Sequence, residues 1–163
     1  MSRAAGKAPA PPMTLQVLKK FRLIYGSVRQ HFRDVEQSAG VSGSQLWILQ
    51  EVMNTPGVGV SELAERLSIH QSTCSQLVEK LVARELVVKS RSETDQRRVG
   101  LSLAPGTKQL LRKAPGPAEG ILPEALKQLS PASLATLDAA LSEVIEQLKH
   151  GDEEFADKPL ADL

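Results

Sequence analysis

The chain has 163 residues, 41% hydrophobic and 24% charged, which suits one compact domain with helical extensions and argues against global disorder. Only 3% are aromatic, so a core must be built mainly from Leu, Val, Ile and Ala, which favours a helical protein. One cysteine excludes an internal disulfide, and no metal-ligand spacing is present, so neither a metal nor another cofactor is expected. No apolar run reaches the ~18–20 residues of a membrane span, and residues 1–12 do not resemble a signal peptide, so we expect a cytoplasmic protein.

The net charge of +1 hides an uneven distribution along the chain. Residues 151–163 hold five acidic residues against one lysine, a net charge of −4, so the remainder carries +5. Between Lys80 and Arg98 there are six basic residues and three acidic ones, a local charge of +3. A basic patch with an acidic segment elsewhere is compatible with a polyanionic partner, although solvated charged faces are common.

A long helix is expected first, from Met13 to about Ser38, and Gly40 should end it. Its apolar residues recur at intervals of three and four, as in a heptad seam, and a stripe of this length needs a partner helix. The seam consists of Leu18, Phe21, Tyr25, Val28, Phe32 and Val35.

Short helices follow in the middle of the chain. Ser42 to Gln45 has the S-x-x-Q pattern of a capping box and opens a helix that Thr55-Pro56-Gly57 should stop. Ser61 is the expected N-cap of a helix that ends near Leu67. After a tight turn at Ser68-Ile69, another helix should run from His70 or Gln71 to about Arg84.

This last helix separates an apolar face from a polar one. Cys74, Leu77, Val78 and Leu81 recur at helical spacing and should face the core. Small polar side chains on the other side suit a groove of duplex DNA, where they can bond to base edges or phosphates. The polar face holds Ser72, Gln76, Glu79 and Ala83, with Thr73, Ser75 and Lys80 at its edges.

Residues 86–89 and 99–103 read as two strands by their β-branched content and alternation. Their connection, Ser90 to Arg98, carries Arg91, Arg97 and Arg98. A hairpin tip with arginines can enter a minor groove, where narrow A·T-rich DNA concentrates negative potential.

The C-terminal part is expected to be helical. A helix should start near Pro105, break at residues 115–117 and resume until about Leu129, with a candidate kink at Pro123. Ser130-Pro131 should be the N-cap and first residue of a last helix that Gly151 ends. That helix repeats the heptad-like spacing, and the acidic tail 151–163 is predicted to be disordered. Its seam is Leu134, Leu137, Leu141, Val144 and Leu148.

The order of these elements resembles the multiple antibiotic resistance regulator (MarR) family of winged-helix transcription factors, over roughly Val17 to Leu148. The segment DQRRVGLSLAPGT is similar to the family's wing, and SIHQSTCSQLVEKLVARELV is similar to its recognition segment. The resemblance implies a mainly α fold with a small β-hairpin wing. It divides the chain into a leader (1–12), an N-terminal dimerisation helix (13–40), a winged helix-turn-helix lobe (41–104), C-terminal dimerisation helices (105–150) and a tail (151–163).

The resemblance also implies a function: a homodimeric repressor on a pseudo-palindromic operator, released by a small, often aromatic or anionic ligand. It implies that Asp95 and Arg97 stabilise and aim the wing. Three positions depart from the family pattern. Ser68 and Glu85 stand where glycine is usual, and His70 stands at an N-cap usually held by Ser or Thr. We expect Glu85 to force a different exit from the recognition helix.

Other interpretations stay open at this point. Cys74 can be a redox sensor or a core residue, and its helical position favours packing. His31 and Trp47 can line an effector pocket or simply belong to the core. Because no nucleophile elbow, phosphate loop or paired-carboxylate motif is present, an enzyme is not expected. A winged helix that binds only protein is the remaining alternative.

Overall fold

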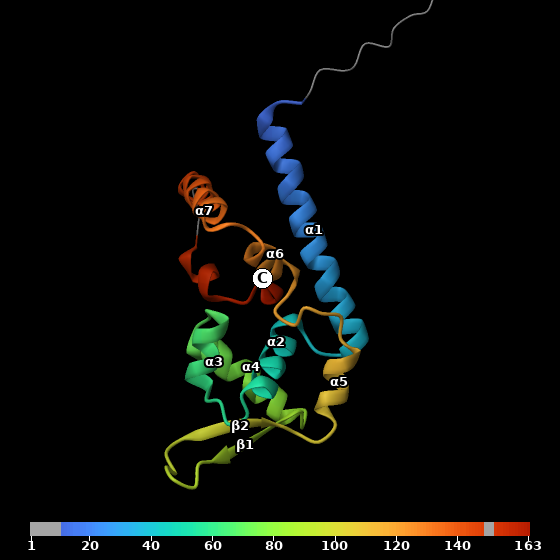
Figure 1. Ribbon diagram of the computed structural model, residues 1–163, viewed down its shortest axis with the longest axis vertical. Helices are drawn as coiled ribbons and strands as arrows, with labels where there is room; N and C mark the ends of the chain where they lie inside the picture. Colours follow the sequence, from blue (N-terminus) through green and yellow to red (C-terminus); the bar gives the residue numbers. More distant parts are fainter. Residues whose placement is uncertain (1–10, 149–151) are drawn as a thin grey trace, which may run out of the picture.

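The computed structural model describes residues 11–148 and 152–163, so the predicted leader, apart from two exposed prolines, and the predicted helix end at Gly151 lie outside the described residues. The described chain is mostly helical with one small antiparallel hairpin, as predicted (Figure 1). Its elements are α1 (Met13–Ala39), α2 (Gly43–Asn54), α3 (Val60–Leu67), α4 (Gln71–Ala83), β1 (Val87–Arg91), β2 (Val99–Leu103), α5 (Thr107–Lys113), α6 (Ile121–Lys127), α7 (Pro131–Glu146), η1 (Glu153–Asp157) and η2 (Leu160–Asp162).

The elements form a lower and an upper part, with α1 running along one side of both (Figure 1). Helices α2, α3 and α4 make the lower part, and the β1–β2 hairpin projects from its end. Helices α6 and α7 lie in the upper part, and the chain returns from α7 to end beside α6 and α2. None of the helices in the described ranges combines the length and hydrophobicity that a bilayer crossing needs.

Local capping rules account for several helix ends. Gly40 ends α1 in the left-handed conformation, at φ +68°. The capping box at the start of α2 is complete, because Ser42 Oγ accepts the N–H of Gln45 at 3.2 Å and Gln45 Oε1 accepts the N–H of Ser42 at 3.0 Å. Ser130 Oγ accepts the N–H of Ser133 at 3.1 Å and caps α7. These three predictions are confirmed.

Other predicted ends were wrong. Gly59, not Ser61, is the N-cap of α3: Val58 pairs with Leu101 in an isolated bridge, Gly59 is also extended, and the helix begins at Val60. Pro123 is the third residue of α6, where a missing N–H costs no intrahelical bond, so it does not interrupt a longer helix. Helix α7 ends at Glu146, which leaves Leu148 of the predicted seam beyond the helix.

Two residues that are not glycine bracket α4 in the left-handed conformation. Ser68 has φ +54° and Glu85 has φ +58°. The N–H groups of Glu85 and Leu86 reach the carbonyls of Val82 and Leu81 at 2.9 and 3.0 Å, which closes the helix end. The prediction that Glu85 forces a different exit is therefore wrong. Residue 85 adopts the left-handed backbone conformation that glycine would take, and its side chain makes that conformation energetically unfavourable.

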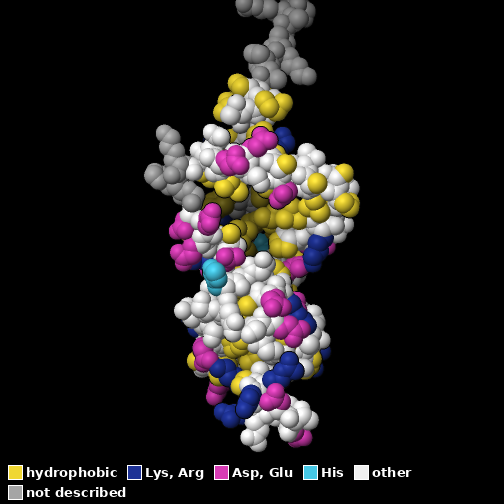
Figure 2. Space-filling model, turned by 90° about the vertical axis from the view of Figure 1, so that its left-hand side faces the viewer, with side chains coloured by type: hydrophobic (Ala, Val, Ile, Leu, Met, Phe, Trp, Pro, Cys, Tyr) yellow, Lys and Arg dark blue, Asp and Glu magenta, His cyan; other side chains and the backbone are white. Residues whose placement is uncertain are grey.

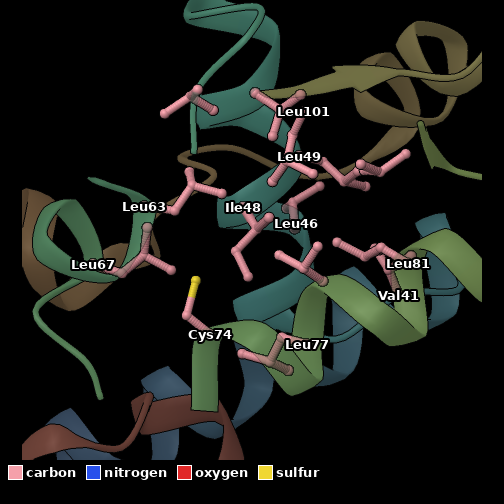
Figure 3. Close-up of a cluster of buried hydrophobic side chains, with 14 of the residues drawn as sticks. Val41, Leu46, Ile48, Leu49, Leu63, Leu67, Cys74, Leu77, Leu81 and Leu101 are labelled. Carbon is pink, nitrogen blue, oxygen red and sulfur yellow. The ribbon is translucent and has the colours of Figure 1, made fainter. Parts of the chain in front are cut away.

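One cluster of buried side chains joins α2, α3, α4 and the hairpin (Figure 3). The predicted core face of α4 is confirmed, since Cys74, Leu77, Val78 and Leu81 are all buried. The strands pair with Val87 opposite Leu103, and β1 continues two residues further than predicted, through Arg91. The largest fully buried members are Leu46, Ile48, Leu49, Leu63, Leu81 and Leu101.

Two glycines permit close approaches that a side chain would block. A Cβ on Gly100 would lie 2.8 Å from the carbonyl oxygen of Gly57, so the hairpin can meet the turn after α2 only because residue 100 lacks one. A Cβ on Gly43 would lie 2.5 Å from the ring of Phe32 and 3.2 Å from the Cβ of Ala161. Gly43 therefore sets the distance between α1, α2 and the end of the chain.

The predicted disorder of the tail 151–163 is contradicted for its described residues. Residues 152–163 form η1 and η2, and Pro159 between them is buried. Asp152 caps η1 by accepting the N–H of Glu154 at 2.9 Å. The acidic composition did not prevent docking, because Asp157 and Asp162 meet the positive N-terminal ends of α4 and α2.

Candidate nucleic-acid interface and the adjoining cavity

The polar face of α4 is open to solvent. Ser72, Gln76 and Lys80 are exposed, and Thr73 and Ser75 are half-buried at its edges. The buried face on the other side of the same helix anchors it in the core, so these polar groups stand on a fixed support. All can exchange hydrogen bonds with base edges or phosphates.

Arg66 fixes α3, the helix that precedes α4. Its guanidinium lies 3.0 Å from Glu51 Oε2 of α2, 2.9 Å from Thr55 Oγ1, and also pairs with Glu62. The hydrogen bond with Glu51, reinforced by Glu62, raises the pKa of Arg66 above its ordinary value. This network ties α3 to α2 and so supports the turn into α4.

The tip of the hairpin is ordered by its own polar groups. Asp95 Oδ1 accepts the N–H of Arg97 at 3.0 Å, and the carbonyl of Asp95 accepts the N–H of Arg98 at 3.0 Å. Ser92 Oγ and Thr94 Oγ1 lie 2.9 Å apart, and the N–H of Ser92 donates to the carbonyl of Arg98 at 3.0 Å. Arg97 and Arg98 are exposed on this tip, whereas Arg91 is the last residue of strand β1.

A further ion pair, between Glu79 and Lys89, links α4 to β1. Glu79 was placed on the polar face by sequence, but its partner could not be inferred from spacing alone. The pair places a positive charge beside the one carboxylate that the sequence assigned to the polar face of α4.

Sequence reasoning missed a polar cleft between the start of α3 and the hairpin tip. It is lined by Gly59, Ser61, Glu62, Arg97 and Arg98, among others. The N–H groups of the first turn of α3 and the two guanidinium groups are the donors that a phosphate needs. Ser61 was predicted to cap a helix, and its position in this cleft was not predicted. Lys and Arg side chains gather around the hairpin end of the face shown in Figure 2.

Cys74 is fully buried, and its sulfur points into the core cluster between Ile48 and Leu67 (Figure 3). Burial raises the pKa of its thiol to about 11, so the reactive thiolate is scarce near neutral pH. The geometry supports the packing interpretation and gives the redox alternative no exposed thiolate.

A cavity of about 140 Å³ lies above this lobe. Trp47 lines it, as the pocket interpretation requires, but His31 does not; its buried ring lies beside Phe32, with ring centroids 6.0 Å apart. Among the described residues of the lining, Glu119 alone is charged, and it pairs with Lys127. The remaining lining is nearly all apolar: Val28, Phe32, Leu67, Ile69, Ile121, Leu122, Pro123, Leu126, Pro159, Leu160 and Ala161, with Gly43, Ser44 and Gly120.

Comparison with known proteins gives a consistent result. Residues 39–98 match the model of the MarR family. The chain is 32% identical over 85 residues to a Thauera aromatica protein assigned to transcriptional regulation of the hcr operon, covering 52% of this chain and 51% of that protein. It is 24% identical over 80 residues to the HTH-type transcriptional repressor MdtR of Bacillus subtilis, covering 49% and 52%. The match thus spans about half the length of each curated relative.

The fold is shared more widely than the sequence. The crystal structure of Streptococcus pneumoniae FabT in complex with DNA superposes with a TM-score of 0.54 at 16% identity, covering 83% of this chain and 97% of FabT. The matched segment spans the capped α2, the helix pair α3–α4 and the hairpin tip, so this part of the chain is similar to the MarR family, and the likeness to FabT shows a shared fold.

Proposed function

We propose that the protein is a sequence-specific DNA-binding transcriptional regulator that acts as a homodimeric repressor on a pseudo-palindromic operator. One observation carries the proposal: the exposed polar face of α4 and the exposed arginines of an ordered hairpin tip belong to one rigid lobe. In this arrangement α4 reads a major groove while Arg97 and Arg98 meet the neighbouring minor groove and backbone. Members of the family are transcriptional regulators, and no catalytic role is proposed.

Dimerisation is supported by apolar surface that the single chain leaves uncovered. Helix α1 buries Val28, His31 and Val35 in its second half only, and α7 buries none of its residues. A helix that exposes an apolar stripe calls for a partner surface. The exposed residues include Leu18, Phe21, Ile24 and Tyr25 on α1, and Leu134, Leu137, Val144 and Ile145 on α7.

The cavity supports control by a small molecule. Its apolar lining fits an uncharged, largely apolar or aromatic compound. The anionic ligand that the family resemblance allows is less suited, because the charged group of the lining is the carboxylate of Glu119. A compound that binds here lowers DNA affinity only as far as it prefers the state that does not bind DNA. Quenching of Trp47 fluorescence by a compound that also releases DNA supports this part of the proposal.

The decisive experiment begins with a footprint on the DNA flanking the protein's own gene, followed by titrations of the protected site. Arg97→Ala should weaken binding most at A·T-rich flanks and reduce the slope of log affinity against log salt by about one unit. Arg112→Ala, which removes an exposed arginine on α5, is the matched control and should leave the slope unchanged. Equal changes of the salt slope in the two variants, or no binding to DNA in either the footprint or the titrations, would favour the alternative of a protein-binding module.

A further inference from the structure

The C-terminal segment, residues 152–163, is attached to the DNA-binding lobe at two separate points. The carbonyl of Asp157 accepts the N–H of His70 at 3.1 Å, and Asp157 Oδ2 lies 3.2 Å from His70 Nε2. Further along, Asp162 Oδ1 accepts the hydroxyl of Ser44 at 3.1 Å. Ser44 is itself buried, so this bond gives its hydroxyl a partner inside the protein.

Both points of attachment are helix N-termini. His70 is the N-cap of α4 and forms no side-chain cap of its own, and Ser44 is in the first turn of α2. The N-terminal end of a helix carries a partial positive charge and unpaired N–H groups, so an aspartate is attracted to each. The segment thus contacts the N-cap residue of α4 twice, through the backbone carbonyl and the carboxylate of Asp157.

Between Lys158 and Asp162 the segment is apolar and forms part of the cavity wall. Pro159 is buried, and Pro159, Leu160 and Ala161 line the cavity together with Trp47. Ala161 packs against the start of α2, where only the absence of a Cβ on Gly43 makes room. The same twelve residues therefore touch both the cavity and the first residue before the recognition helix.

The attachment has the character of a reversible contact. The side chains of His70 and Asp157 remain 54% and 49% exposed, so water competes for their interaction and its contribution is small. Ordering this segment also costs conformational entropy, which opposes docking. A docked state with these opposing contributions can be displaced by a competitor for the same space.

We propose that residues 152–163 are a built-in peptide ligand of the groove that α1, α2 and α6 line beside the N-cap of α4, and that a small apolar compound entering the cavity displaces them. Displacement removes Asp157 from His70 and loosens the N-terminus of the recognition helix. Binding of a compound in the cavity is in this way coupled to the stability of the α4 N-terminus within one chain. The regulatory consequence rests on the proposed function, but the docking and its displacement do not require DNA binding.

The test compares the full chain with a chain ending at residue 151 by amide hydrogen exchange and Trp47 fluorescence. The His70 amide should exchange about tenfold faster without the segment, as expected for the loss of one hydrogen bond. Trp47 emission should shift to longer wavelength, and the uncharged apolar dye N-phenyl-1-naphthylamine should bind more tightly. A synthetic peptide of residues 152–163 should reverse these changes, whereas a peptide of the same composition in scrambled order should not.

Point variants in the full chain separate specific docking from charge. Asp157→Ala with Asp162→Ala removes both carboxylate contacts, so the His70 amide should exchange faster than in the unmodified chain but more slowly than in the truncated one, because the Asp157 backbone carbonyl is still present. Glu153→Ala with Glu154→Ala removes the same charge but leaves both attachment points, so it should behave like the unmodified chain. If the truncated chain loses its helical circular dichroism, the two double variants decide. Equal exchange at His70 in both double variants would overturn the proposal, whatever the outcome of the operator titrations.

Discussion

The buried thiol of Cys74 has a consequence for stability at alkaline pH. Its pKa is raised to about 11 by burial, whereas in the unfolded chain it stays near the ordinary value of 9.0. Below pH 9 the thiol is protonated in both states and its contribution is fully present. As pH rises from 9 to 11 the unfolded chain ionises first, so the free energy of unfolding should fall by about 2 kcal/mol.

This fall can be measured as the difference between the unmodified chain and Cys74→Ala in urea unfolding at pH 8 and pH 11, because the other titrating groups cancel in the difference. At pH 8, labelling of the native protein by a thiol reagent should be slow and should accelerate with urea. Rapid labelling of the folded chain would mean that the thiol is accessible and would reopen the redox interpretation.

Gly100 is a second residue whose environment fixes its identity. The Cβ of an alanine there would lie 2.8 Å from the carbonyl oxygen of Gly57, a backbone atom that cannot rotate away. Gly100→Ala should destabilise the fold by about 1–3 kcal/mol, the usual cost of overpacking. Chemical denaturation measures this loss of stability. Gly26→Ala is the control: an added Cβ there would meet no atom of another element within 4 Å, so the change should be neutral or stabilising.

At the scale of elements, the exit from α4 offers a sharp test of backbone strain. Glu85 is held at φ +58°, a conformation that disfavours every side chain but costs glycine little. Glu85→Gly should therefore stabilise the protein by about 0.5–1 kcal/mol. Arg84→Gly, one residue earlier at φ −87°, gains no such relief and should destabilise it. Thermal unfolding of both variants checks the sign, and a loss of stability for Glu85→Gly would contradict the strain argument.

Elements governed by neighbouring residues could be predicted from the sequence. The capping box at Ser42, the glycine end of α1 and the buried face of α4 depend on spacing within a few residues, and each is found as expected. Strand β1 is longer than predicted because its pairing with β2, rather than its own composition, decides where it ends.

What the sequence could not supply is contact between distant segments. The docking of Asp157 on His70 joins two stretches that share no pattern, and acidic composition alone suggested disorder. His31 and Trp47 both follow the apolar stripes of their helices, yet only Trp47 reaches the cavity. The cleft beside Ser61 likewise requires α3 and the hairpin tip to be brought together in space.

For the whole molecule, the proposed dimer is the property that most depends on surfaces far from the proposed DNA-binding lobe. Leu18→Asp or Leu137→Asp places a charge in an exposed apolar stripe and should shift the protein to a monomer in analytical ultracentrifugation, because burying an unpaired charge is costly. Operator affinity should fall with it, since two linked recognition helices gain from binding together. Lys19→Asp, beside the stripe, should remain dimeric. A monomer before any substitution would refute the dimer.

Gly43 links three parts of the molecule that are remote in sequence: the ring of Phe32 on α1, the start of α2, and Ala161 near the end of the chain. Over evolutionary time these positions cannot drift independently. A larger residue at 43 is tolerable only if position 32 becomes smaller or the C-terminal segment no longer packs there. Related sequences that retain the docked segment should therefore keep glycine at 43, and those that have lost it should be released from that constraint.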